Sequence, residues 1–192
     1  MSKWIGLYVV AFLALTGADV ASTHWATAGG QAEEFNAVVA TDEGTLHTER
    51  LLWLNAAFLA FSVAMLAWAG KRRDAIDLRL LERPSRALFN YFYLNPFSKK
   101  NVPKSAFHYI AFAPTVLLMK AFAAFNNSLI AAGAPDLVTP FAKAVHGLGA
   151  GPMTYWIVII AIFHPLWYLA LVATARALRG PSLGPAPNAV AG

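Results

Sequence analysis

The sequence predicts an all-α fold: an integral membrane bundle of four transmembrane helices, with an interfacial amphipathic segment between the second helix and the third. Of the 192 residues, 58% are hydrophobic and only 13% are charged, and the mean hydropathy is +0.51. This composition is too apolar for an ordinary soluble domain. Four apolar runs have 20 to 26 residues each, long enough to cross a bilayer. Most of the basic residues lie in one connection between two of these runs.

The first apolar run extends from Trp4 to about His24 and contains an acidic residue, Asp19. Removal as a secretory signal peptide is the alternative, because the Ala-Thr-Ala triplet at 26–28 resembles a small-residue cleavage site. The run is longer than the apolar part of a usual signal peptide, so a retained helix is favoured. An aspartate within a membrane helix costs about 2.5–3.5 kcal/mol on insertion scales. We therefore expect Asp19 to face a partner or a cavity.

Three further apolar runs complete the predicted bundle. They are Leu51 to Gly70, His108 to about Gly133, with Pro114 in its first two turns, and Thr154 to about Leu178. The residues between the last two runs are expected to form a short loop. The end of the chain is rich in Pro, Gly and Ala, so we expect a membrane domain over residues 1–179 and a flexible tail over residues 180–192.

The charges of the connections predict the orientation. The connection from Lys71 to Phe107 has nine basic residues against three acidic ones, whereas the connection after the first run is acidic. By the positive-inside rule, the basic connection faces the cytoplasm. The chain is therefore expected in the bacterial inner membrane, with both termini in the cytoplasm.

Part of the basic connection has the pattern of an interfacial helix. Apolar residues recur at roughly helical spacing with arginines between them, which is typical of a segment that lies along the membrane surface. An ordinary connecting loop is the alternative. The basic side chains expected to contact lipid head groups are Arg79, Arg83, Arg86, Lys99 and Lys100.

Polar residues within the predicted spans are expected to form one cluster inside the membrane. They are Asp19, Thr23, Asn55, Lys120, Asn126, Asn127 and His164. A span that starts near Trp4 places Asp19 about 22 Å along its helix, and the long Lys120 side chain can reach that level. We therefore expect an ion pair between Asp19 and Lys120. Two interpretations remain open: the cluster fixes helix packing, or its ionisable members mark a site or a proton path.

The sequence contains no motif that identifies a cofactor or a reaction. The absence of cysteine excludes disulfides, haem attachment through CxxCH and thiolate metal sites. The five histidines lack the HxxxH or HExxH spacing, so neither a metal site nor a cofactor is predicted. The net charge of +5 does not indicate nucleic-acid binding, because most of the surplus lies in the basic connection between apolar runs.

The residues around Asp19 carry a resemblance. In order along the chain they are Asp19, Thr23, Gly29-Gly30 and Glu34-Phe35-Asn36. This pattern resembles a family of small multi-pass bacterial membrane proteins of unknown function, which has a Gly-Gly-x-Glu-x-Asn-Pro element and a lysine in a later helix, matched by Lys120. Here two extra residues separate the glycines from Glu34, and Ala37 replaces the proline. The resemblance covers mostly the first third of the chain and implies no activity.

Three hypotheses for the function follow. The favoured one is a non-catalytic membrane subunit or assembly partner of a larger membrane complex, whose partners are membrane lipids and other membrane proteins or further copies of the chain. Small residues recur along the second run, among them Ala56, Ala60 and Ala64, near the spacing that permits close helix approach. The alternatives are a small proton-coupled carrier that uses Asp19 and Lys120, and a lipid-modifying membrane enzyme.

Overall fold

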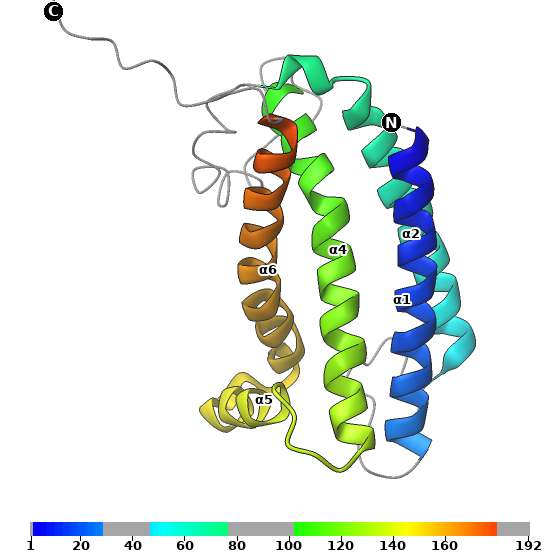
Figure 1. Cartoon of the computed structure of the whole chain (residues 1–192). Coiled ribbons are helices and arrows are strands. Elements are labelled where there is room, and N and C mark those ends of the chain that lie inside the picture. Colours follow the sequence, from blue (N-terminus) through cyan, green and yellow to red (C-terminus); the bar gives the residue numbers. More distant parts are fainter. Residues whose placement is uncertain (1, 29–46, 77–101, 180–192) are drawn as a thin grey trace, which may run out of the picture.

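The computed structural model describes residues 2–28, 47–76 and 102–179 (Figure 1). The described residues form helices and turns without strands. Four segments among them are long and apolar enough, by length and composition, to cross a membrane. Their helices are α1 (Ser2–Ala28), α2 (Thr48–Gly70), α4 (Val102–Ala131) and α6 (Thr154–Arg179). The all-helical class and the four long apolar helices predicted from the sequence are therefore present.

Helices α1 and α4 exceed their predicted apolar runs the most. Helix α1 has 27 residues and α4 has 30, so they are about 40 and 45 Å long at 1.5 Å per residue. Helix α1 continues to Ala28, and its last turn contains no Pro that would end it. The Thr27 hydroxyl donates a hydrogen bond to the carbonyl of Thr23 at 3.0 Å. Helix α4 begins six residues before the predicted start at His108. Pro114 therefore lies in the helix interior rather than in the first two turns.

The predicted loop before α6 contains a short helix that the hydropathy pattern missed. Helix α5 (Thr139–Val145) is followed by the turns η5 (His146–Ala150) and η6 (Gly151–Met153). Gly149 and Gly151 have φ values of 86° and 50°, in the left-handed region that favours glycine. These two glycines let the chain change direction between α5 and α6. A proline in the first turn of α5 was a usable start signal.

Helix α4 is the centre of the bundle. It packs against α1, α6 and α2, and Figure 1 shows it between α6 and α1. One cluster of buried side chains joins α4 to α6, with Phe107, Trp167 and Leu171 at 0–2% exposure. A second cluster joins α1, α2 and α4 through Tyr8, Phe12, Leu66, Ala113 and Val116. Small buried residues on α4 allow the helices to approach closely, which drives helix association where water is absent.

The charges that the structure describes are distributed unequally between the two ends of the bundle. Helices α1 and α4 run in one direction, and α2 and α6 run in the other (Figure 1). The start of α1, the end of α2, the start of α4 and the end of α6 therefore meet at one end, which we call the basic end. Its basic residues are Lys3, Lys71, Arg72, Arg73, Lys104, Arg176 and Arg179. This asymmetry is of the kind that orients a membrane protein.

Several predicted features lie outside the described residues. They include most of the interfacial segment, with Arg79, Arg83, Arg86, Lys99 and Lys100, the tail over residues 180–192, and the Gly29-Gly30 and Glu34-Phe35-Asn36 elements. These features remain predictions.

Candidate functional site

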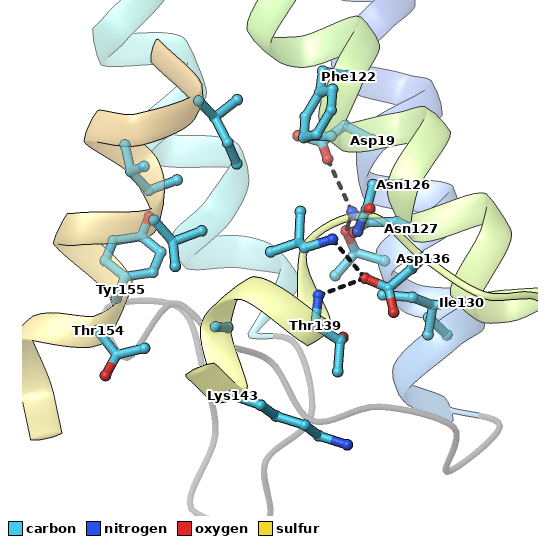
Figure 2. Close-up of a pocket in the computed structure, with 18 of the residues that line it drawn as sticks. Asp19, Phe122, Asn126, Asn127, Ile130, Asp136, Thr139, Lys143, Thr154 and Tyr155 are labelled. Atoms are coloured by element: carbon cyan, nitrogen blue, oxygen red, sulfur yellow. Dashed lines mark hydrogen bonds between the residues drawn. The ribbon is translucent and has the colours of Figure 1, made fainter. Parts of the chain in front are cut away.

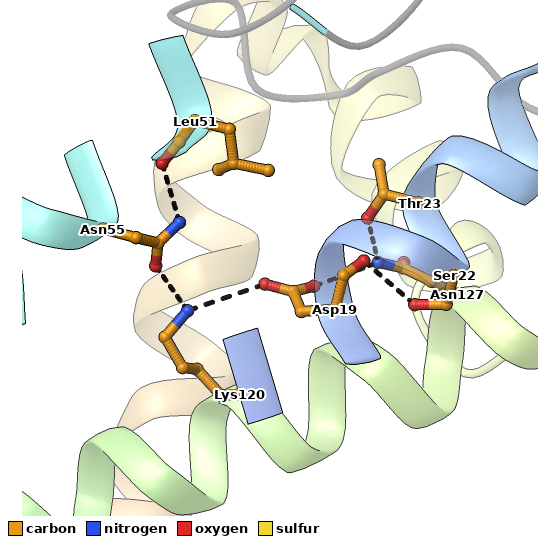
Figure 3. A network of polar contacts seen from close by, with 7 residues as sticks. All are labelled: Asp19, Ser22, Thr23, Leu51, Asn55, Lys120 and Asn127. Atoms are coloured by element: carbon orange, nitrogen blue, oxygen red, sulfur yellow. Dashed lines mark hydrogen bonds and ion pairs between the residues drawn. The ribbon is translucent and has the colours of Figure 1, made fainter. Parts of the chain in front are cut away.

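The ion pair expected between Asp19 of α1 and Lys120 of α4 is present. Lys120 Nζ lies 3.7 Å from Asp19 Oδ2, and the two side chains are 11% and 17% exposed. Lys120 also donates a hydrogen bond to Asn55 Oδ1 of α2 at 2.5 Å, and Asn55 Nδ2 donates to the carbonyl of Leu51 at 2.8 Å. Figure 3 shows this chain of contacts across three helices. One lysine therefore ties α4 to both α1 and α2.

The second oxygen of the Asp19 carboxylate has its own partner. Asn127 Nδ2 lies 3.4 Å from Asp19 Oδ1 and donates to Thr23 Oγ1 at 2.7 Å. Asp19 and Thr23 are four residues apart, and Lys120 and Asn127 are seven apart, so each pair lies on one face of its helix. Because α1 and α4 run in the same direction, Asp19 meets Lys120 at one level of the bundle and Thr23 meets Asn127 at the next (Figure 3).

The position of Lys120 is supported on its other side by an aromatic ring. Its Nζ lies 4.8 Å from the centroid of the Phe12 ring, close enough for a cation–π contact. The ammonium therefore has three neighbours that suit a cation: a carboxylate, an amide oxygen and a ring face. Removing one partner of a buried ion pair typically costs about 3–5 kcal/mol, because the other charge is left uncompensated.

The Asp19 face of this network borders a large cavity. The cavity has a volume of about 1100 Å³ and is lined mainly by residues of α1, α4, α5 and α6 (Figure 2). These residues lie toward the end of the bundle opposite the basic end. We call this the cavity end. Ligand pockets in proteins commonly have about 300–1,000 Å³. The space is therefore large enough for a small organic molecule.

The cavity has two chemically different walls. The polar wall comes from α1, α4 and the start of α5, and it includes Asp19, Thr23, Asn126, Asn127, Asp136 and Thr139. The opposite wall is mainly apolar and comes from α6, with Val158, Ile159 and Ile162 next to the phenol of Tyr155. An amphiphilic molecule could satisfy both walls at once, because its polar group and its apolar body would each meet a wall of its own kind.

Asp136 holds the connection between α4 and α5 in place. Its Oδ1 accepts hydrogen bonds from the backbone amides of Val138 at 2.9 Å and Thr139 at 2.7 Å (Figure 2). The buried side chain of Asn126 accepts a bond from the amide of Leu137 at 2.9 Å. Burial raises the pKa of Asp136, but hydrogen bonds from Thr139, Val138 and Asn126 outweigh it, so this pKa lies below its usual value. The carboxylate is therefore ionised at neutral pH.

The structure brings together most, but not all, of the predicted polar cluster. Asp19, Thr23, Asn55, Lys120 and Asn127 are linked by the contacts described above, and Asn126 lies beside them on the cavity wall. His164 does not line the cavity, and its Nδ1 lies 2.7 Å from the carbonyl of Ile160 on its own helix. The level of His164 along α6 was predictable, but the direction of its side chain around the helix was not.

Sequence reasoning did not assign several cavity residues to the site. Asp136, Thr139, Lys143, His146, Thr154 and Tyr155 all line the cavity. They come from the connection, the short helix and the first turn of α6, which hydropathy treats as a loop and an interface. The one available signal was Asp136 shortly before Thr139-Pro140, because an acid before a proline in the first helical turn indicates a capped helix start.

A second, smaller cavity lies nearer the basic end. It has a volume of about 190 Å³ and is lined by residues of α2, α4 and α6: Phe61, Met65, Ser105, His108, Tyr109, Phe112 and Trp167. His108 is 2% exposed, and its Nδ1 lies 2.7 Å from the carbonyl of Lys104. The rings of His108 and Trp167 are stacked with centroids 5.9 Å apart. Aromatic side chains therefore dominate this cavity.

Comparisons of the chain with protein-family models, with curated proteins and with solved structures found no match. In the part of the chain that the structure describes, no three His, Asp or Glu side chains lie close enough together to hold a metal ion.

Proposed function

We propose that this chain is a small carrier in the bacterial inner membrane, and that it binds its substrate in the cavity with Asp19 at the inner wall. One observation carries the proposal: an ionisable carboxylate within an apolar helix borders a cavity of about 1100 Å³. Ionisable residues within membrane spans usually mark a site or a path. The cavity end would face the periplasm, because the basic end would face the cytoplasm.

The arrangement of α4 supports a path through the bundle. The residues that α4 contributes to the two cavities recur every three or four positions, as Ser105, His108 and Phe112 in the smaller cavity and Met119, Ala123 and Asn126 in the larger one. This spacing places them on one helix face. Movement along that face would carry a substrate past Val116 and Thr115, which are buried between the two cavities. Pro114 removes one helical hydrogen bond at this level.

The ion pair supports a coupling mechanism. Asp19 can exchange Lys120 for a proton or for a cationic group of a substrate, since Lys120 would keep Asn55 and the Phe12 ring as partners. Lys120 does not line the cavity, whereas Asp19 does. A substrate would therefore meet the carboxylate first.

Thiol labelling tests the water access that a carrier needs, and the cysteine-free sequence makes the experiment direct. Ala123→Cys places a thiol on the cavity wall, whereas Ala121→Cys places one on the exposed opposite face of the same helix. In oriented membrane vesicles, a membrane-impermeant methanethiosulfonate should label the first variant at least ten times faster. Equal labelling rates would contradict a water-filled cavity. Labelling of Ala123→Cys from both sides indicates alternating access, whereas labelling from one side only indicates a binding protein that does not transport.

One observation supports the assembly-partner hypothesis: α2 has a largely exposed surface. Only 11% of the most apolar part of α2 is buried, the smallest fraction among the four spans, and Ala56, Ala60 and Ala64 are all exposed. We infer that this face could meet a second membrane protein. The double variant Ala60→Leu/Ala64→Leu should then abolish a complex recovered in mild detergent while the chain still folds. An unchanged complex would eliminate this face as the interface.

The lipid-modifying enzyme hypothesis gains no support from the described residues, because its proposed head-group contacts, Arg79, Arg83 and Arg86, lie outside them.

A further inference from the structure

We propose that the ligand of the large cavity is an amphiphilic amine: an ammonium group that binds at Asp19, on an apolar chain that lies along α6. This inference rests on the proposed function, since it assigns a chemical class to the molecule that the cavity would bind. It follows from three properties of the walls, namely their hydrogen-bonding capacity, their charge and their division into polar and apolar parts.

Most of the hydrogen-bond donors of the polar wall already have protein acceptors, whereas free acceptor positions remain. Both amide hydrogens of Asn127 are directed at Thr23 and Asp19. The backbone amides of residues 137–139 donate to Asn126 and Asp136. A carboxylate can accept about four hydrogen bonds, and Asp19 has one contact at each oxygen, to Asn127 and to Lys120. A ligand that donates hydrogen bonds therefore suits this wall better than one that only accepts them.

The charges favour a cationic donor over a neutral one. Two carboxylates line the cavity, Asp19 and Asp136, together with two exposed basic side chains, Lys143 and His146. Figure 2 shows Lys143 at the opposite end of the cavity from Asp19. The deep part of the cavity thus presents a negative group, and Lys120 lies behind that group rather than in the cavity. An ammonium at the deep end would have the Asp19 carboxylate as its nearest charged neighbour on the cavity wall.

The apolar wall fits a hydrocarbon body. Val158, Ile159 and Ile162 recur along one face of α6, and Met119 and Phe122 of α4 also line the cavity. The volume of about 1100 Å³ accepts a chain of eight or more carbons together with its head group. The required chemistry, a primary ammonium on an apolar chain, occurs both in soluble alkylamines and in the head group of an aminophospholipid.

Binding of three probes with the same apolar chain tests the ligand class. The full-length protein is placed in nanodiscs of phosphatidylcholine and phosphatidylglycerol, which contain no primary amine, and equilibrium binding of radiolabelled octylamine, octanol and octanoate is measured. We expect saturable binding of octylamine at one site per chain, at least tenfold weaker binding of octanol, and no saturable binding of octanoate. Equal binding of octylamine and octanol would overturn the assignment.

Two pairs of variants locate the binding. Asp19→Asn should weaken octylamine binding at least tenfold, whereas Glu49→Gln, which removes an exposed carboxylate outside the cavity wall, should leave it unchanged. Ile159→Trp should block binding by filling the cavity, while Ile160→Trp on the exposed face should not. The tryptophan pair keeps the test decisive if Asp19→Asn does not fold. Binding that persists in both Asp19→Asn and Ile159→Trp would overturn the proposal.

The outcomes separate this inference from the proposed function. If Ala123→Cys is labelled but octylamine does not bind, the amine class is wrong and the water-accessible cavity stands. If Ala123→Cys is not labelled, the proposed function itself fails. Adding phosphatidylethanolamine to the nanodiscs distinguishes the two sources of the amine. Competition with octylamine indicates a lipid ligand, whereas unchanged octylamine binding indicates a soluble one.

Discussion

At the basic end, α4 and α6 meet through Phe107, Trp167 and Leu171, which are at most 2% exposed. At the cavity end, the same two helices line different walls of the cavity of about 1100 Å³. The residues of α4 explain part of the difference. Ala106 and Ala111 belong to the closely packed cluster at the basic end, whereas the larger Met119, Phe122 and Asn126 line the cavity farther along α4. One helix thus supplies a packed contact and a cavity wall, and the two ends should respond differently to substitution.

The largest expected effect is at the ion pair beside the cavity. Asp19→Ala should destabilise the protein by about 3–5 kcal/mol, because Lys120 is left without its carboxylate. The double variant Asp19→Ala/Lys120→Met should lose less, since no charge remains unpaired. The measurement is the free energy of unfolding in mixed micelles. Additive losses from the two single variants would show that the residues are not coupled.

A pair of substitutions on α6 compares the packing of the two ends directly. Leu171→Ala, at 0% exposure, should cost about 2 kcal/mol, near the lower limit for a buried leucine. Ile162→Ala, on the cavity wall, should cost clearly less, because its side chain already borders empty space. The same unfolding measurement serves for both. Equal losses of unfolding free energy in the two variants would mean that the cavity is closed in the protein in micelles.

Asp136 provides a pH-dependent test at the cavity end. Asp136→Ala should cost about 1 kcal/mol, because the amides of Val138 and Thr139 at the start of α5 lose their acceptor. Because the pKa of Asp136 is lowered in the folded protein, its stabilisation is complete above the ordinary carboxyl pKa of about 3.9 and is lost as the pH falls through the lowered value.

The isosteric variant separates the charge of Asp136 from its hydrogen bonds. Asp136→Asn keeps an oxygen acceptor but not the charge, so its unfolding free energy should depend less on pH below about pH 4. A pH profile identical to that of the unsubstituted protein would show that Asp136 does not contribute.

The smallest expected effect is in the packed contact between α1 and α2, away from the cavity. Tyr8 donates a hydrogen bond to Ser62 at 2.8 Å, and Ser62 also bonds to the carbonyl of Leu59. Tyr8→Phe should therefore cost only about 0.6 kcal/mol, the average for such bonds between membrane helices. Tyr155→Phe, on the cavity wall, is the matched control for loss of a phenol hydroxyl. A loss above about 2 kcal/mol for Tyr8→Phe would mean that this bond organises the helix pair.

Hydropathy predicted the four helices because a helix that crosses a membrane needs about 20 apolar residues, and such a run is visible in the local composition. The contact between Asp19 and Lys120 was also predictable, since a charge within a span requires a partner. The helix ends were wrong at α1 and α4 because residues beyond the apolar run still favour helix. A hydropathy profile marks the end of the apolar run, not the end of the helix.

The cavity could not be predicted in the same way. It depends on how Gly149 and Gly151 direct the chain from α5 into α6, and therefore on backbone geometry rather than on composition. The position of His164 also depends on the rotation of α6 about its axis, which a strongly apolar helix does not encode clearly. Asp136 was overlooked as a site residue because a carboxylate in a connection is normally read as solvated.

The order in which the partners of Asp19 are synthesised has a consequence for biogenesis. Asp19 and Asn55 are translated before α4, and Lys120 follows Asp19 by about 100 residues. At a synthesis rate of about 5–20 residues per second, Lys120 is made about 5–20 seconds after Asp19. In the proposed membrane bundle, α1 and α2 would be in the translocon or at its lateral exit during that interval, with an unpaired acid. In that bundle, the insertion machinery would hold or protonate Asp19 until α4 arrives, and truncation of the nascent chain before Lys120 is expected to leave α1 only partly integrated.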